Sequence, residues 1–278
     1  MRHHPLTLLT FMLLCMEPGL AADRNVGVTS FDSIRVEGPF KVEIVTGAAP
    51  SARISGDIRA VDAVSITSNG TNVTIRQSSI NWGGMPGDDP GRATIRLATP
   101  ALARASVLGS GELHINRVTG GDLRLSVGGS GRLRVDDVQG IALVATLHGS
   151  GTLDLAGRVE KASISLDGSG ELRGDELVVD HLSALLDGAG SMSLQAHTTA
   201  KLRALGSGVA RISGSAACVV ENKGSGTAEC GPQLMRTPAA SSSAPTPAPA
   251  SAPVASPPAT RTAQDPSGVR IHRGTVPR

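Results

Sequence analysis

Apolar and polar residues alternate with a period of two over most of residues 109–230, and the alternating segments recur at a nearly constant interval. Each segment follows a glycine, counted here as position 0, with apolar residues at positions +4 and +6. The positions between them are mostly polar, which is the pattern of a strand with one buried and one solvated face. Position +4 is occupied by Leu113, Leu133, Leu153, Leu172, Met192, Ala210 and Ala228, and position +6 by Ile115, Val135, Leu155, Gly174, Leu194, Ile212 and Cys230.

The same alternation precedes each glycine. Positions −6, −4 and −2 are apolar in five successive copies, the first of which is Leu123, Leu125 and Val127. Each repeat therefore predicts two short half-buried strands joined at a glycine corner, because glycine reaches positive φ without a side-chain clash. Gly-Ser-Gly tripeptides begin at Gly109, Gly129, Gly149, Gly168, Gly206 and Gly224, with a relaxed Gly-Ala-Gly copy at Gly188, in steps of 20, 20, 19, 20, 18 and 18 residues.

One repeat is too small to fold alone. It offers about five inward side chains worth roughly 1.5–3 kcal/mol each, whereas ordering some twenty residues costs about 1–2 kcal/mol apiece. The repeats must therefore stack, with equivalent strands parallel and about 4.8 Å apart. The sequence predicts an all-β fold, a parallel β-helix or β-solenoid with repeats of 18–20 residues. Outward charges then alternate down the stack, with Glu112 beside Arg132, and with Arg134, Asp154 and Arg173 in one column.

Residues 23–108 carry shorter strand signals with weaker repetition. Residues 33–37 and 40–45 predict two strands around a tight Gly-Pro turn, and further strands are predicted near 52–55, 64–67, 72–76, 93–97 and 105–108. Residues 77–92 predict an irregular loop, and no segment has the pattern of a long amphipathic helix. We expect this region to supply the first turns and the cap of the solenoid, because an uncovered sheet end invites edge-to-edge association.

The two ends of the chain differ in composition from the repeats. Residues 1–22 combine a short basic start with an apolar run too short to span a bilayer and small residues near Ala21 and Ala22, the pattern of a cleaved signal peptide. From residue 237 onward Pro, Ala and Ser dominate, so residues 237–278 are predicted to be a disordered spacer. The folded domain is accordingly placed at 23–236, in an exported protein that is periplasmic, secreted or at the cell surface.

Composition and cysteine positions narrow the picture further. The formal net charge of +2 argues against bulk electrostatic binding of nucleic acid, and no segment after the leader is long and apolar enough for a transmembrane anchor. Cys218 and Cys230 lie at positions −6 and +6 around Gly224, so both point inward from facing strands. In an oxidising compartment they are expected to form a disulfide that staples the last turn. No metal site or cofactor is predicted, since no further cysteine or suitably spaced histidine accompanies the pair.

Two stretches together resemble one known family. Residues 31–44, FDSIRVEGPFKVEI, are similar to the opening of the head GIN domain family, and the later Gly-Ser-Gly-x-Leu series is similar to that family's repeating body. The resemblance covers residues 28–231. It implies a secreted or envelope-exposed β-solenoid of the kind described as the head of auto-transporter adhesins, and it brings no catalytic residues with it.

A small set of residues has the right chemistry for a site. His148, Asp167 and Asp187 occupy position −1 of three successive repeats, so stacking brings them about 4.8 Å apart, within range for acid–base chemistry or a cation. The competing interpretation is that they are solvated corner residues. Trp82, in the irregular loop, either stacks on a sugar ring or plugs the end of the solenoid.

The sequence favours an exported, non-enzymatic adhesion, binding or scaffold module of the cell envelope. Its expected partner is an envelope polymer, a glycan or a protein surface, with homo-oligomerisation as a further option and nucleic acid excluded. The candidate binding residues are Trp82, His148, Asp167 and Asp187, and no catalytic or metal-ligating residue is assigned. The alternative is a polysaccharide lyase or hydrolase that uses the His148 column. A concave acidic cleft would favour the enzyme, and flat charged ladders would favour the scaffold.

Overall fold

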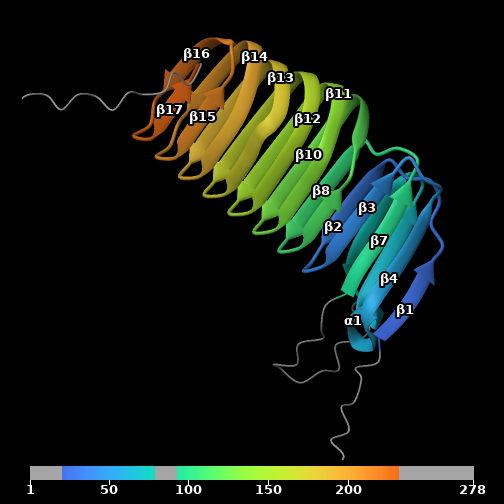
Figure 1. Ribbon diagram of the computed structural model, residues 1–278. Coiled ribbons are helices and arrows are strands. Elements are labelled where there is room, and N and C mark those ends of the chain that lie inside the picture. The colour runs from blue at the N-terminus through green and yellow to red at the C-terminus, as the bar shows by residue number, and fades with distance from the viewer. Residues whose placement is uncertain (1–20, 79–92, 232–278) are drawn as a thin grey trace, which may run out of the picture. The chain divides into compact units, whose positions relative to one another are not determined.

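The computed structural model describes residues 21–78 and 93–231. These segments contain seventeen strands and one short helix (Figure 1). No helix in them combines the length and the apolar composition needed to cross a bilayer. The predicted signal peptide, the residue Trp82 and the predicted spacer at 237–278 lie outside the described residues, apart from the last residues of the leader, and stay predictions.

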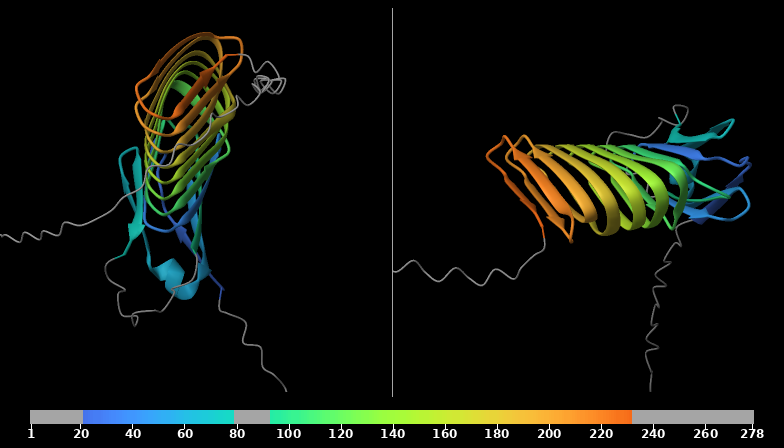
Figure 2. Two further views of the ribbon diagram at one scale, coloured as in Figure 1. Left: turned by 90° about the vertical axis from the view of Figure 1, so that its left-hand side faces the viewer. Right: turned by 90° about the horizontal axis from the view of Figure 1, so that it is seen from above.

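The predicted parallel β-solenoid is confirmed. Each strand of the repeat region pairs in parallel with its equivalent one repeat later, so that Leu133 stands between Leu113 and Leu153. About six turns, called rungs below, stack in this way, and a view along the stack shows successive coils superposed (Figure 2). The strands are β8 (Arg104–Gly109), β9 (Glu112–Ile115), β10 (Val118–Gly129), β11 (Arg132–Gly149), β12 (Thr152–Gly168), β13 (Glu171–Gly188), β14 (Ser191–Ala204), β15 (Val209–Ser213), β16 (Ala217–Asn222) and β17 (Thr227–Cys230).

The solenoid has two broad faces. The first face holds the strands that begin after each glycine corner, namely β9, the first halves of β11–β14, β15 and β17. The second face holds the strands that lead into the corners, namely β8, β10, the second halves of β11–β14, and β16. Only one bend of each rung is a repeated Gly-Ser-Gly or Gly-Ala-Gly corner; the other bend also holds glycines, among them Gly157 with a φ of +123°, but at positions that vary from rung to rung. The prediction of two separate short strands per repeat is therefore wrong for β11–β14, which run through the other bend. Register shifts between Val135 and Val138, and between Asp154 and Ala156, accommodate that bend within the ladder.

The glycine corners bond to one another down the stack. The amide of Ser150 donates to the carbonyl of Gly129 at 3.0 Å, and that of Ser169 donates to Gly149 at 3.0 Å. Gly149 has a φ of +109°, and a Cβ built on it would stand 2.6 Å from the Gly129 oxygen. Glycine is therefore required at this corner for two separate reasons, the left-handed backbone and the close approach of the rung beneath.

Small aliphatic side chains fill the interior. Leu113, Leu133, Leu153 and Leu172 form one column of the first face, and each has 0% of its surface exposed. The inward and outward positions predicted from the alternation are thus the observed ones. A narrow interior of this kind is filled without large rings, which accounts for the near absence of aromatic residues in the repeats.

The N-terminal strands join the same stack, but not in sequence order. Strand β2 lies between β6 and β8, and β3 lies between β7 and β9, with all four pairings parallel. The β2–β3 rung is thus inserted between the rung made by β6 and β7 and the rung made by β8 and β9. Beyond β6 and β7 the pairing turns antiparallel. The elements are β1 (Ala21–Val26), β2 (Ser33–Glu37), β3 (Lys41–Thr46), β4 (Ser51–Asp57), α1 (Ile58–Asp62), β5 (Val64–Asn69), β6 (Asn72–Gln77) and β7 (Ala93–Thr99).

One buried and one partly buried set of polar contacts hold this end together. Thr99, which is 0% exposed, donates its hydroxyl to the carbonyl of Phe31, and the amide of Phe31 donates to Thr99 Oγ1 at 3.3 Å. Arg24 of β1 has a buried Nε, and its Nη2 donates to the carbonyl of Val64 at 2.6 Å, which links the outermost strands of the two faces. The region forms the first rungs and a cap, as predicted, but strand β1 and the one-turn helix α1 were not predicted.

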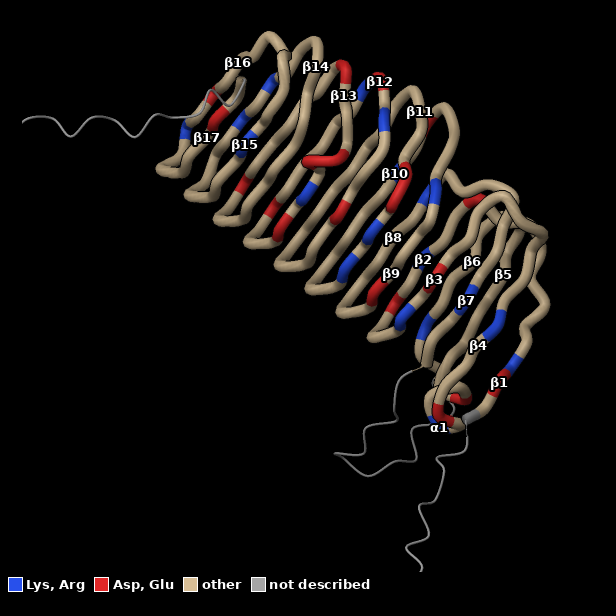
Figure 3. Tube along the Cα trace, viewed as in Figure 1, with Lys and Arg blue, Asp and Glu red and all other residues tan. Residues whose placement is uncertain are grey.

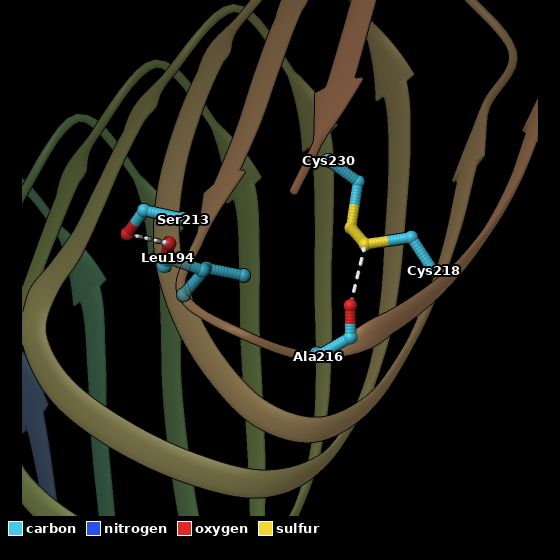
Figure 4. Close-up of a disulfide and its surroundings, with 5 residues drawn as sticks. All are labelled: Leu194, Ser213, Ala216, Cys218 and Cys230. Atoms are coloured by element: carbon cyan, nitrogen blue, oxygen red, sulfur yellow. Dashed lines mark hydrogen bonds between the residues drawn. A yellow bond between two sulfur atoms is a disulfide. The ribbon is translucent and has the colours of Figure 1, made fainter. Parts of the chain in front are cut away.

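The predicted disulfide closes the other end of the stack. Cys218 of β16 and Cys230 of β17 are bonded, with their Cα atoms 6.0 Å apart (Figure 4). Both cysteines are partly buried against the core. Because β16 belongs to the second face and β17 to the first, the bond ties the two faces together in the last rung.

Candidate binding surface

The predicted corner column is assembled by the fold. His148 pairs in register with Asp167, and Asp167 with Asp187. His148 Nδ1 lies 3.5 Å from Asp167 Oδ2, but the two side chains are 62% and 67% exposed. Catalytic electrostatic interactions are strongest in a water-excluded site, and these two side chains stand in the open. No set of three or more His, Cys, Asp or Glu side chains in the described segments is grouped to hold a metal ion.

The first face carries a ladder of ion pairs. Asp154, with 15% of its side chain exposed, lies 3.9 Å from Arg132 and 3.4 Å from Arg173. Arg173 also donates to Glu171 at 2.6 Å. Figure 3 shows basic and acidic positions interspersed along the stacked strands. The predicted neighbours, Glu112 with Arg132 and Asp154 with Arg173, stand in register. Charges on this face are therefore largely neutralised within the protein.

A second group of charges lies at the bend that follows the first face. Asp136 accepts hydrogen bonds from His114 Nε2 at 2.6 Å and from Arg134 Nε at 2.8 Å. Partial burial raises the pKa of the Asp136 carboxyl, but the hydrogen bonds from Arg134 and His114 outweigh it, so that this pKa lies below its usual range. Arg117 pairs in the same way with Asp137 at 2.8 Å.

A shallow depression on the first face repeats this balance of charge. Its volume is about 260 Å³, and it lies across β11, β12 and β13. Three arginines and three carboxylates line it. Because the signs cancel, the depression has no preference for a charged ligand of either kind. The charged side chains are Arg132, Arg134, Arg173, Asp154, Asp175 and Glu176.

The second face holds a larger hollow, called the trough below. It has a volume of about 500 Å³ and crosses five neighbouring strands, β6, β2, β8, β10 and β11. Its polar lining consists of arginines, hydroxyls and one amide. None of these residues was predicted from the sequence to form a site, although the alternation predicts that they point outward. Its polar side chains are Arg35, Arg104, Arg124, Ser33, Ser106, Ser126, Thr74, Thr146 and Asn72.

Comparison with known proteins identifies the family. A family model described as "Putative auto-transporter adhesin, head GIN domain" matches residues 30–216, more than half of the chain. The chain belongs to the head GIN domain family. The resemblance carried by residues 31–44 and by the Gly-Ser-Gly-x-Leu series is thereby confirmed. No functionally curated protein matches the sequence.

Solved structures share this head GIN fold. One, described as a "putative adhesin" from Bacteroides fragilis, is 19% identical, with a TM-score of 0.69 over 77% of this chain and 98% of that chain. A "Putative lipid binding protein" from Parabacteroides distasonis is 21% identical, with a TM-score of 0.60 over 76% and 97%. A "putative adhesin" from Parabacteroides merdae is 18% identical, with a TM-score of 0.59 over 76% and 96%. Identities this low show the fold alone.

Proposed function

We propose that this protein is an exported, non-enzymatic adhesion or binding module of the cell envelope. Its family is described in terms of adhesin heads, and structural neighbours carry the same description. The observation that carries the proposal is the trough on the second face, an open hollow of about 500 Å³ across five strands. An open hollow of this extent suits a long ligand laid along the stack better than a small molecule enclosed for reaction.

The stacked architecture supports the same proposal. Each strand is bonded to its neighbour over most of its length, so outward side chains are held on a rigid backbone. Side chains in register repeat about every 4.8 Å along the stack. A repetitive polymer meets equivalent contacts at each rung, and many weak contacts then add to useful avidity.

The test is a glycan array and a panel of isolated envelope polymers probed with the labelled full chain, run beside a turnover assay on the same polymers. We expect saturable binding to at least one polymer and no release of reducing ends or unsaturated products. Chain cleavage that scales with protein concentration would contradict the non-enzymatic part. Absence of binding to every polymer and envelope fraction would contradict the binding part.

The polysaccharide-acting alternative keeps one supporting observation, the stacking of His148 on Asp167. It is tested by the variant His148→Ala/Asp167→Asn/Asp187→Asn in the same turnover assay. Under the proposed function this variant folds and binds like the natural chain. Turnover in the natural chain that disappears in the variant would establish the enzyme instead.

A further inference from the structure

Two arginines of the trough have no carboxylate partner. Within the described segments no ion pair joins Arg104 or Arg124 to an acidic group, whereas Arg35 is bound to Glu37 at 2.6 Å. Asp122 lies two residues before Arg124 on the same strand, and it also forms no ion pair with that arginine. The trough therefore keeps positive charge that the described residues do not neutralise with an ion pair.

The two unpaired arginines stand side by side. Arg104 of β8 and Arg124 of β10 are partners in the parallel register, which puts their backbones about 4.8 Å apart. Like charges directly opposite one another on neighbouring strands repel and destabilise a sheet. On the first face Asp154 stands in register between Arg134 and Arg173. Arg53 and Arg96 are also register partners, but Asp23 and Glu43 neutralise them. Arg104 and Arg124 therefore repel each other in an open hollow, and an anionic ligand that binds between them would remove this repulsion.

Short hydroxyl side chains surround these arginines. Ser33 is the register partner of Arg104, and Ser106 is flanked by Arg35 on one side and Ser126 on the other. The serines are half-buried and the arginines exposed, so the arginines stand above a floor of hydroxyls. Across five strands this floor extends about 19 Å, because neighbouring strands are about 4.8 Å apart.

We propose that the trough binds a linear acidic polysaccharide. The guanidinium groups of Arg104 and Arg124 pair with its carboxylate or sulfate groups in the bidentate manner that arginine favours. The hydroxyls of Ser33, Ser106 and Ser126 exchange hydrogen bonds with its ring hydroxyls. This inference rests on the proposed binding function and specifies its ligand. Single-stranded nucleic acid fits less well, because no aromatic side chain lines the trough to stack on a base.

The probe is oligogalacturonate of defined length, and its methyl ester is the neutral control with the same sugar backbone. We expect the full chain to bind the acid at least tenfold more tightly than the ester, with an affinity that falls as salt is added. The variant Arg104→Gln/Arg124→Gln should bind about 100-fold more weakly, because each charge-assisted contact is worth about tenfold. Arg117→Gln/Arg134→Gln removes the same charge from ion-paired arginines elsewhere and should change binding less than about twofold.

A folding control separates lost binding from lost structure. Because Arg104→Gln/Arg124→Gln removes a repulsion, this variant should unfold at the same temperature as the natural chain or a higher one. Oligogalacturonate should raise the unfolding temperature of the natural chain and leave that of the variant unchanged.

Each remaining outcome overturns a defined part of the inference. Equal binding of the ester, or equal weakening by both double variants, would show that the trough is not the anion site. Poly-glutamate binding as tight as oligogalacturonate, and equally lost in the trough variant, would show recognition of charge without sugar. Binding of another envelope polymer that the trough variant retains would leave the adhesion function standing and remove the trough from it. No binding of any polymer would end both proposals.

Discussion

Four glycines allow backbone conformation and crowding to be tested separately. Gly149 has a φ of +109°, and a Cβ there would lie 2.6 Å from a carbonyl oxygen of the rung beneath. Gly131 lacks a positive φ but would be equally crowded, at 2.6 Å from such an oxygen. Gly70 has a φ of +61° and open space around it, and Gly121 has open space without a positive φ. Alanine therefore adds both conformational strain and crowding at Gly149, crowding alone at Gly131, strain alone at Gly70 and neither at Gly121.

The expected losses of unfolding free energy follow from these differences. Gly70→Ala should cost about 1–2 kcal/mol, the penalty of a left-handed backbone for a residue with a Cβ. Gly131→Ala should cost about 1–3 kcal/mol, the range for forcing extra volume into a packed site. Gly149→Ala combines both and should cost about 2–5 kcal/mol. Gly121→Ala should be neutral or stabilise by up to about 1 kcal/mol, because alanine has less freedom to lose in a strand.

Urea unfolding followed by circular dichroism measures all four variants. In a domain of this size a loss of 1 kcal/mol lowers the melting temperature by about 2–4 °C, so Gly149→Ala should melt roughly 4–20 °C below the natural chain. The decisive comparison is between Gly149→Ala and Gly70→Ala, which share the positive φ. Equal losses in these two would refute the claim that each corner is crowded by the rung beneath it. A harmless Gly131→Ala would refute the same claim independently.

Three further predictions concern the ends of the stack and its charges. Replacing Cys218 and Cys230 together by alanine should lower the unfolding free energy by about 3 kcal/mol, because the disulfide closes a loop with a separation of 12 residues. A reductant should cause the same loss in the natural chain and have no effect on the variant. A hydrogen bond from Arg96 lowers the pKa of Glu43, and one from Arg173 lowers the pKa of Glu171. The two ionised carboxylates therefore stabilise the folded state above the ordinary carboxyl pKa, and this stabilisation is lost as the pH falls below about 4. Between pH 6 and pH 3 the variant Glu43→Gln/Glu171→Gln should lose less unfolding free energy than the natural chain, as measured by urea unfolding at each pH. The difference should be roughly 1 kcal/mol or less, because both ion pairs are exposed. Thr99→Val should cost about 1–3 kcal/mol by leaving the backbone of Phe31 without its partner, whereas Thr94→Val on the outward side of the same strand should be nearly neutral; similar losses in both would contradict the role assigned to Thr99.

The repeat region was predictable because two local patterns act together. The period-two alternation of residues such as Leu133 and Val135 specifies which side chains point inward. The constant repeat length then specifies the register, since a shift by one residue would turn the buried row to solvent. The disulfide between Cys218 and Cys230 followed from the same two patterns, because both cysteines occupy inward positions of the last rung. The continuous passage of β11–β14 through the second bend was missed, because the glycines of that bend, such as Gly140 and Gly157, do not recur at one position of the repeat.

The N-terminal rungs depended on information that no local pattern carries. Strands β2, β3, β6, β7 and β8 were predicted close to their observed positions, but their spatial order was not. The insertion of β2 between β6 and β8 joins residues about 40 and 70 positions apart, and alternation within a strand does not say which distant strand will pair with it. Thr99 and Arg24 stabilise this order through contacts that appear only after the strands have paired.

The candidate site shows the same division. From the sequence alone, the column of His148, Asp167 and Asp187 was recognisable because its spacing follows the repeat. The trough was not recognisable, because it forms where Ser33 and Arg35 of β2 come beside Arg104 and Ser106 of β8, across the out-of-order rung. By itself the sequence determined the stack, its inward side chains and its disulfide, since burial and a fixed period constrain each of them. Only the tertiary structure decided the rung order and the arginine surface, because outward side chains are free of packing constraints and acquire their neighbours from long-range strand pairing.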